Sequence, residues 1–474
     1  MSFPRGAAAG LLGSSAIFAL GNGLSRAVAY ALPPLLAGWI APEEMGLVAL
    51  LTTAAVILRT VLGLGLTTSA GAVYYEVPVE RRGEVIATTA LLLGTATVAG
   101  VLLCLVAPAV PGLPLAQAGA LMPALAFAGA GLQLLAQPYA LALQFQGRPL
   151  AHLAVTAAAA AAGVALALVL VVGLGRGAWG WLEAGALGAL VGVVLAARAA
   201  GTPLLAASAP VARKLMRLGW PFIPGAAFMA ALQGAGPFIL ARVDGLAAAG
   251  VYNAGYGLGM TMSLATTGFS SAWFPYFQSF AARQHEAPHA FGRVLMIAIG
   301  AFGCAAILFY ALAPLARLLL VDPRYGGAVH VVGDVALSQA LLAIWSILVP
   351  ALYFSRKIWI ASAVQGLGAG VAVIVTYVLV LHAGAANAGL GAVAGACVMI
   401  AVQWVVNGQA DSPAGSFVRF EHAWAGCAVG ICLVLARTMA DSVGSLASAG
   451  TGGALAGCAA VAVWAAGRRA SLWA

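Results

Sequence analysis

Long apolar segments separated by short polar connections dominate this chain and constrain its fold more than any other feature. Fourteen such segments, each of about 20 residues or more, are bounded by charges, prolines or glycine clusters. A helix of about 20 apolar residues crosses a hydrocarbon core about 30 Å thick. Because hydrophobic residues make up 63% of the chain and charged residues 7%, it is neither an ordinary soluble domain nor a disordered chain. The sequence therefore predicts an all-α, polytopic membrane protein with about 14 transmembrane helices.

The positive charges are distributed unevenly over the connections between these segments. The expected spans lie near residues 11–40, 46–74, 85–108, 116–143, 150–173, 178–198, 216–240, 250–280, 290–318, 327–354, 358–382, 386–409, 421–440 and 446–467. With the N-terminus in the cytoplasm, fifteen Lys and Arg residues fall in cytoplasmic connections and tails and four in external ones. Cytoplasmic loops carry such an excess, so we expect both termini in the cytoplasm. Orientation accounts for the net charge of +9, and no nucleic-acid partner is expected.

Repeated spacing indicates two similar halves. Tyr75 follows Gly46 by 29 positions in the first half, and Tyr276 follows Gly250 by 26 in the second. Parallel repeats occur in secondary transporters, where the substrate path runs between the repeats. We expect a six-helix lobe at 1–200, a cytoplasmic linker at 201–217, a second six-helix lobe at 218–410, and two further helices with a cytoplasmic tail at 411–474.

Two arginines lie deep inside the first two apolar segments. Arg26 precedes Ile40 by 14 residues, and Arg59 follows Gly46 by 13. At 1.5 Å per residue, both lie about 20 Å below the turn that joins the segments, a little past the midplane. A charge at that depth costs at least about 2.5 to 3.5 kcal/mol and normally faces a protein interior or a wet cavity. Two cations at one depth, with no deep carboxylate in either segment, favour an anion site inside the membrane.

A polar stripe on the first helix accompanies these arginines. Ser15, Asn22, Arg26 and Tyr30 follow one another at spacings of seven, four and four, which places them on one face. That stripe would line a cavity. The alternative for both arginines is that they snorkel toward the cytoplasmic headgroups or cap carbonyls of a neighbouring helix.

The second half contributes further candidate residues, but it has no buried arginine equivalent to Arg26 and Arg59. Its polar residues inside expected spans include Gln233, Asn253, Tyr256 and Asp334. Asp334 is a candidate coupling carboxylate, although an acid this near the external end of its span is as often solvated or paired, here with Arg317 or Arg324.

Nucleotide-driven transport and catalysis are both disfavoured. The only two lysines, Lys214 and Lys357, follow no glycine-rich loop, so the chain has no phosphate-binding P-loop. We therefore expect no resident cofactor, and coupling would come from Na⁺, H⁺, the membrane potential or a substrate gradient. No external connection is long enough to hold a catalytic domain, which indicates that the chain is not an enzyme.

Five short motifs occur in a fixed order along nearly the whole chain. They are APEEMG after the first segment, LGWPFIPG opening the seventh, AGVYNAGYG opening the eighth, SAWFPYF closing it, and ALYFSRKIW between the tenth and eleventh. In these motifs and their order, the chain resembles the bacterial polysaccharide flippases of the multidrug and oligosaccharidyl-lipid exporter superfamily. The resemblance implies two six-helix lobes in a V-shaped exporter arrangement plus two additional C-terminal helices. It also implies a flippase that moves undecaprenyl-pyrophosphate-linked sugar units, such as O-antigen or exopolysaccharide repeats, from the cytoplasmic to the periplasmic leaflet of the inner membrane.

The resemblance also suggests roles for individual residues. In related lipid II flippases, arginines of the first two helices line a central cationic cavity, and Arg26 and Arg59 resemble those positions. Many relatives carry an Asp-Arg pair in the seventh span, where this chain reads LQGAG around Gln233, so an ion-coupling role for that helix lacks support. The implied partners are the lipid-linked oligosaccharide, the bilayer, and polysaccharide polymerase and chain-length proteins.

Simple electrostatics supports the same substrate, because a pyrophosphate carries at least two negative charges and bidentate arginine holds such groups well. Three alternatives remain. A cation-coupled multidrug antiporter of the same superfamily would need deep carboxylates, and spans one, two, seven and eight contain none. A lipid II flippase would carry the same pyrophosphate. A structural membrane scaffold would not need paired intramembrane charges.

Overall fold

The computed structural model describes a chain of helices. The described residues are 21, 23, 25–63, 65–106, 119–201, 207–280, 283–318, 320, 322–355, 357–409, 417–442 and 445–469. Within these ranges there are helices and short connections but no β-strand, as the apolar spans predict. The chain divides into two compact units, with unit 1 drawn from Met1–Leu32 and Trp39–Ala230 and unit 2 from Pro33–Gly38 and Ala231–Ala474.

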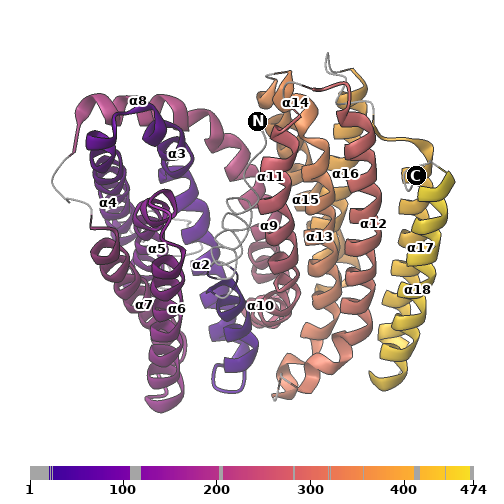
Figure 1. Cartoon of the computed structure of the whole chain (residues 1–474). Coiled ribbons are helices and arrows are strands. Elements are labelled where there is room, and N and C mark those ends of the chain that lie inside the picture. The colour runs from indigo at the N-terminus through magenta and orange to yellow at the C-terminus, as the bar shows by residue number, and fades with distance from the viewer. Residues whose placement is uncertain are drawn as a thin grey trace. The chain divides into compact units, whose positions relative to one another are not determined.

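Unit 1 holds residues 25–32 of the first helix, whose described turns run over residues 25–36, and seven further helices (Figure 1). These are α2 (Pro42–Leu62), α3 (Leu66–Glu76), α4 (Arg82–Val106), α5 (Leu121–Phe145), α6 (Pro149–Ala167), α7 (Gly177–Ala200) and α8 (Ala209–Gly219). A core of apolar residues, among them Val48, Leu51, Phe127 and Leu182, joins α2, α5 and α7. Gly100 of α4 lies directly against the Phe127 ring, so these two helices approach closely, as small residues allow in membrane proteins.

The described part of the expected linker is mostly the helix α8 and belongs to unit 1. Val211 and Leu215 on one side of α8 are buried against apolar residues of α3 and α4. Arg213 and Lys214 on the other side are exposed, and Lys214 pairs with Glu76 at the end of α3. In Figure 1, α8 crosses the ends of the other unit 1 helices instead of running parallel to them. An amphipathic sequence of this kind favours such a position at a membrane surface.

The second apolar segment is not the continuous helix that its composition predicts. The helix α2 ends at Leu62, and α3 begins at Leu66 after a turn in which Gly65 has a φ of +62°. The side of Gly65 that would carry a Cβ faces the carbonyl oxygen of Gly219, at the end of α8. Glycine permits both the left-handed backbone and this close approach. The contact between Gly65 and Gly219 therefore fixes the position of the helix break.

Unit 2 holds ten helices in the described ranges. They are α9 (Ile223–Val243, which starts in unit 1), α10 (Leu246–Met260), α11 (Met262–Gln278), α12 (Ala287–Leu312), α13 (Val329–Leu348), α14 (Pro350–Phe354), α15 (Ile358–Ala383), α16 (Gly389–Gly408), α17 (Phe420–Ser442) and α18 (Ser445–Arg469). The last two pack on α12, where Gly300 contacts Val463 and Gly303 contacts Val429. Their apolar residues belong to the same core as those of α12 and α13.

Twelve stretches in the described ranges are long and apolar enough to cross a membrane. They correspond to the expected spans except the first and the eighth. The first runs through residues outside the described ranges, and the eighth is divided at Thr261 into α10 and α11, each of them short. The count of about 14 is thus approached but not reached by these criteria, and a multi-pass membrane protein is established.

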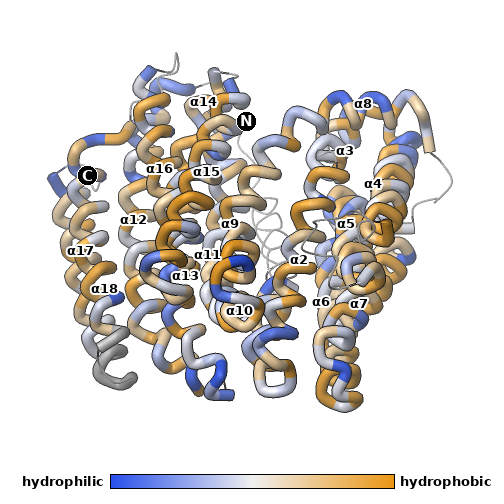
Figure 2. Tube along the Cα trace, turned by 180° about the vertical axis from the view of Figure 1, so that it is seen from behind, coloured by the Kyte–Doolittle hydropathy of each residue, from blue (hydrophilic) through white to orange (hydrophobic). Residues whose placement is uncertain are grey.

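Hydrophobic residues make up most of the length of the helices (Figure 2). Leu102, Ile374 and Val434 are each more than half exposed. Large apolar side chains are exposed in this way where the solvent is lipid, while a soluble protein would bury them. The hydrophilic residues in Figure 2 gather mainly at helix ends and along α8.

Candidate functional site

Arg59 lies in the last turn of α2, just before the helix break. The backbone N–H of Gly63 donates to the Arg59 carbonyl at 2.7 Å and closes that turn. A cation is favoured there because the free carbonyls at a helix C-terminus carry partial negative charge. The side chain is partly exposed, and its Nη1 donates to the carbonyl oxygen of Ala130 on α5 at 3.4 Å. Among the described residues no carboxylate pairs with Arg59, so its remaining guanidinium donors are not committed to an acid.

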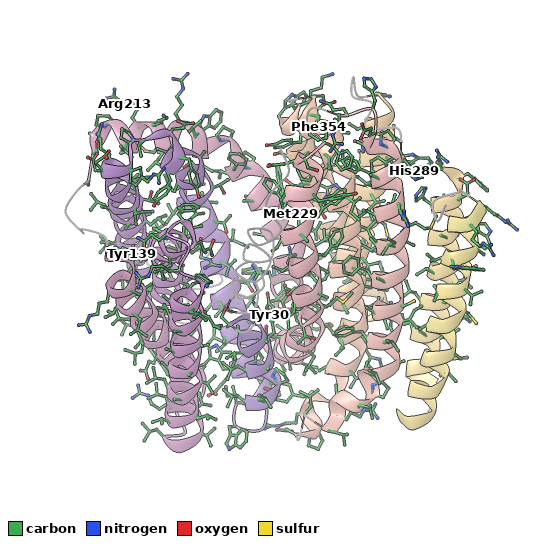
Figure 3. All side chains as sticks on the ribbon, viewed as in Figure 1. Tyr30, Tyr139, Arg213, Met229, His289 and Phe354 are labelled. Carbon is green, nitrogen blue, oxygen red and sulfur yellow. The ribbon has the colours of Figure 1, made fainter. Side chains whose placement is uncertain are left out.

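Tyr30 and Arg26 occupy one face of the first helix. They are four residues apart, a single turn, and so are neighbours on its surface. Tyr30, labelled in Figure 3, is half-buried and lies close enough to Arg59 for their side chains to interact electrostatically. Arg26 is exposed. The first two helices therefore bring Tyr30 to Arg59 and place Arg26 one turn along. Ser15 and Asn22, the other two members of the predicted stripe, lie outside the described residues.

The candidates of the second half form a separate group in unit 2. Gly236, three residues after Gln233 on α9, packs on the Tyr252 ring of α10, where an added Cβ would lie 3.0 Å from the ring. The rings of Tyr252 and Tyr256 are 5.9 Å apart. The face of α9 that carries Gln233 thus packs beside the tyrosines of α10, and Asn253 lies on the same helix. Gln233, Asn253 and Tyr256 are each half-buried.

Asp334 is fully buried and has partners that the sequence did not predict. Its Oδ1 accepts a hydrogen bond from the Tyr310 hydroxyl at 2.6 Å and lies 3.4 Å from Nη1 of Arg437 on α17. The sequence offered Arg317 or Arg324 as alternative partners, but the ion pair that the structure shows for Asp334 is with Arg437, while Arg324 binds Asp322 through two nitrogens. Asp334 lies inside α13, facing α12 and α17, whereas Arg324 precedes that helix.

Arg437 is the functional candidate that sequence reasoning missed. Like Arg26 and Arg59, it falls inside an expected span and is not among the nineteen Lys and Arg residues of the connections and tails. An intramembrane arginine is a candidate site in its own right. That signal was present in the sequence, but only packing identifies Asp334 as its partner.

A cavity of about 330 Å³ lies elsewhere in unit 1, lined by Arg176, Trp179 and Glu183. Arg176 and Glu183 form an ion pair at 2.5 Å across it, and both are partly exposed. Gly177 beside the cavity packs on Glu44, near the start of α2, which is 15 residues before Arg59. At 1.5 Å per residue that is about 22 Å along the helix. This concavity is consequently no part of the arginine site, and its tryptophan and ion pair suit a membrane–water boundary.

Known structures with a similar fold are membrane transporters. The lipid II flippase MurJ in an inward closed conformation matches with a TM-score of 0.62 and 10% identity, over 93% of this chain and 97% of that one. An inward-facing multidrug resistance MATE family transporter of the MOP superfamily gives 0.59 and 14%, over 81% and 93%. An outward-facing structure of such a transporter gives 0.58 and 14%, over 83% and 94%. The chain therefore has the fold of the MATE and MurJ transporters.

The family follows from the sequence of the first half and the start of the second. Residues 11–281, more than half of the chain, match the model of the polysaccharide biosynthesis protein family, and the chain belongs to that family. This confirms the resemblance carried by the five motifs. A comparison with curated proteins found no match.

Proposed function

We propose that this protein is a flippase for an undecaprenyl-pyrophosphate-linked oligosaccharide, an O-antigen or exopolysaccharide repeat unit. It would carry this lipid from the cytoplasmic to the periplasmic leaflet of the inner membrane by alternating access. The observation that carries the proposal is the position of Arg59, inside a span, beside Tyr30, and without a described carboxylate partner. Membership of the polysaccharide biosynthesis protein family supports the substrate class.

A pyrophosphate suits the chemistry of this site. Each of its phosphates offers oxygens to the planar guanidinium fork, and the low dielectric of a membrane interior strengthens the attraction. Arg59 has donors to spare beyond its contact with Ala130, and Arg26 supplies a second cation one turn from Tyr30. The polyprenyl tail can remain in lipid while the charged headgroup crosses, so transport needs no bond to break. We therefore assign the chain transport and no catalytic step.

The alternatives differ in the charge that they require. A cation-coupled multidrug antiporter needs a deep acid to hold a cation, but the buried Asp334 is bonded to Tyr310 and paired with Arg437. A lipid II flippase would use the same anion chemistry, so the arginines do not distinguish it. The headgroup sugars must be compared directly.

The test is a leaflet-accessibility assay in vesicles that contain the purified protein. Three lipids or solutes are compared: an undecaprenyl-pyrophosphate-linked oligosaccharide, lipid II and a cationic drug. We expect the first to become accessible in the opposite leaflet at least tenfold faster than in protein-free vesicles. Preferential movement of lipid II would replace the oligosaccharide in the proposal, and drug movement without lipid movement would reject the flippase.

The orientation proposed for this flippase is testable by reporter fusions. Because fifteen of the nineteen Lys and Arg residues in the connections and tails fall on one side, fusions within 201–217 and after the last helix should report cytoplasm. A fusion within residues 41–46, the turn before α2, should report periplasm and serves as the matched control. A periplasmic signal at the C-terminus, with 201–217 still cytoplasmic, would contradict the assignment of α17 and α18 as two spans.

A further inference from the structure

Asp334 is the most deeply buried acid that the structure describes, with 0% of its side chain exposed. It lies in α13, inside a candidate membrane span. An ionised carboxylate in such a place needs a nearby positive charge and hydrogen-bond donors, because burial without them costs several kcal/mol. The residues that contact Asp334 must therefore supply the positive charge and the hydrogen-bond donors that balance its carboxylate.

The balancing charge comes from α17, one of the two helices beyond the twelve expected in the repeat. Nη1 of Arg437 lies 3.4 Å from Oδ1 of Asp334, the oxygen to which the Tyr310 hydroxyl donates at 2.6 Å. Nη2 of Arg437 donates to Oδ1 of Asn387 at 2.9 Å. Asn387 in turn donates from Nδ2 to the carbonyl oxygen of Ala383. One guanidinium thus joins α17 to α13 and to the turn between α15 and α16.

The packing around the pair is close on the other sides as well. Gly389 at the start of α16 lies directly against the Asp334 side chain, and Gly333 lies directly against the Tyr310 ring. Tyr252 of α10 is buried and close enough to interact electrostatically with Asp334. His330 precedes Asp334 by one turn of α13 and is half-buried. Among the described residues, the titratable and charged groups around Asp334 include Arg437, Tyr310, Tyr252 and His330.

We infer that Arg437 is a built-in counter-ion for Asp334, and that this pair fastens the α17–α18 hairpin to the rest of unit 2. The carboxylate charge is then balanced by the chain itself instead of by a mobile Na⁺ or H⁺. This goes beyond the proposed function, since it concerns the role of Asp334 and the two last helices and not the substrate. It replaces the coupling role that the sequence suggested for Asp334 with an anchoring one.

A double-mutant cycle on the full-length protein tests the inference. The variants are Asp334→Asn, Arg437→Gln and the two together, with thermal unfolding measured in detergent at several NaCl concentrations and pH values. We expect each single change to lower the Tm by about 5–10 °C, because it leaves a buried charge without its partner. The double change should cost clearly less than the sum of the two.

Ion dependence separates a counter-ion from an ordinary packing contact. In Arg437→Gln the stranded carboxylate should recruit a cation, so its Tm should rise with added Na⁺ or with falling pH. The wild type and the double variant should not show this response. Arg437→Lys should recover part of the lost stability. The matched control is Arg324→Gln, which removes an exposed ion pair with Asp322 and should change the Tm by less than about 2 °C.

Three outcomes would overturn the inference. The first is a Tm loss in the double variant equal to the sum of the two single losses. The second is a double variant that fails to fold although Arg437→Lys folds. The third is a wild-type Tm that depends on Na⁺ and loses that dependence in Asp334→Asn. These measurements need no substrate, so their failure is distinguishable from failure of the flippase proposal. If the Arg59 variants lose flipping and the double Asp334 and Arg437 variant loses less Tm than the sum of the single variants, the flippase proposal and the counter-ion inference are each supported.

Discussion

Replacing Arg59 by alanine is expected to abolish most flipping of lipid-linked oligosaccharide while the protein still folds and inserts. Arg59 donates one long hydrogen bond to Ala130, so its removal costs the fold little, whereas a bound pyrophosphate would lose a charge-assisted bond. Such a bond contributes roughly 1.5 to 3 kcal/mol, or about ten- to a hundredfold in affinity. Arg26→Ala should act in the same direction. The measurement is the leaflet-accessibility rate at matched protein levels.

Two controls sharpen that experiment. Arg59→Lys should restore flipping only in part, because a lysine keeps the charge but loses the bidentate fork. Arg317→Ala removes an exposed arginine of unit 2 and should leave the rate unchanged. If the Arg26→Ala, Arg59→Ala double variant flipped lipid at the normal rate, the arginines would be snorkelling residues and the anion site would be rejected.

The second large effect is expected from Gly65→Ala, at the break between α2 and α3. An alanine there must adopt a φ of +62° and place its Cβ against the carbonyl oxygen of Gly219. Strain of the left-handed backbone costs about 1 kcal/mol, and a clash with main chain adds more, so we expect about 2–3 kcal/mol of lost stability. Thermal unfolding in detergent should show a Tm several degrees lower.

Gly147→Ala is the matched control for Gly65→Ala. Gly147 has a φ of +65°, but its missing Cβ would meet no atom within 4 Å. It therefore carries the backbone strain without the clash, and its Tm should fall by less. Equal losses in the two variants would show that the contact with Gly219 does not hold the break in place.

The helix break also bears on the arginine site. Because α2 ends at Leu62, three residues after Arg59, the cation lies in the last turn, where the C-terminus of the helix carries partial negative charge. A continuous helix would place its C-terminus farther from Arg59 and leave the charge less well stabilised. We therefore expect Gly65→Ala to lower the rate of lipid flipping even when the protein is folded. The rate is compared with that of Gly147→Ala at a temperature where both variants are folded, so that a difference in stability does not explain the slower flipping.

The sequence by itself determined the class of the fold, most of the spans and the family. Span length, apolar composition and motif order are local properties, and a membrane leaves a helix as nearly the only way to satisfy the backbone of an apolar segment. The position of Arg59 within the second span could likewise be read from its distance to the turn before α2.

Tertiary structure alone decided which groups meet. The partner of Asp334 is Arg437, about a hundred residues later, and the contact that breaks the second span at Gly65 comes from Gly219, more than 150 residues later. Neither pairing leaves a periodic signal, because both depend on how closely two distant helices pack. The sequence placed a carboxylate inside a span and offered Arg317 or Arg324 as partners because they are near it along the chain. The partner in the structure is Arg437, which helix packing brings near Asp334 in space.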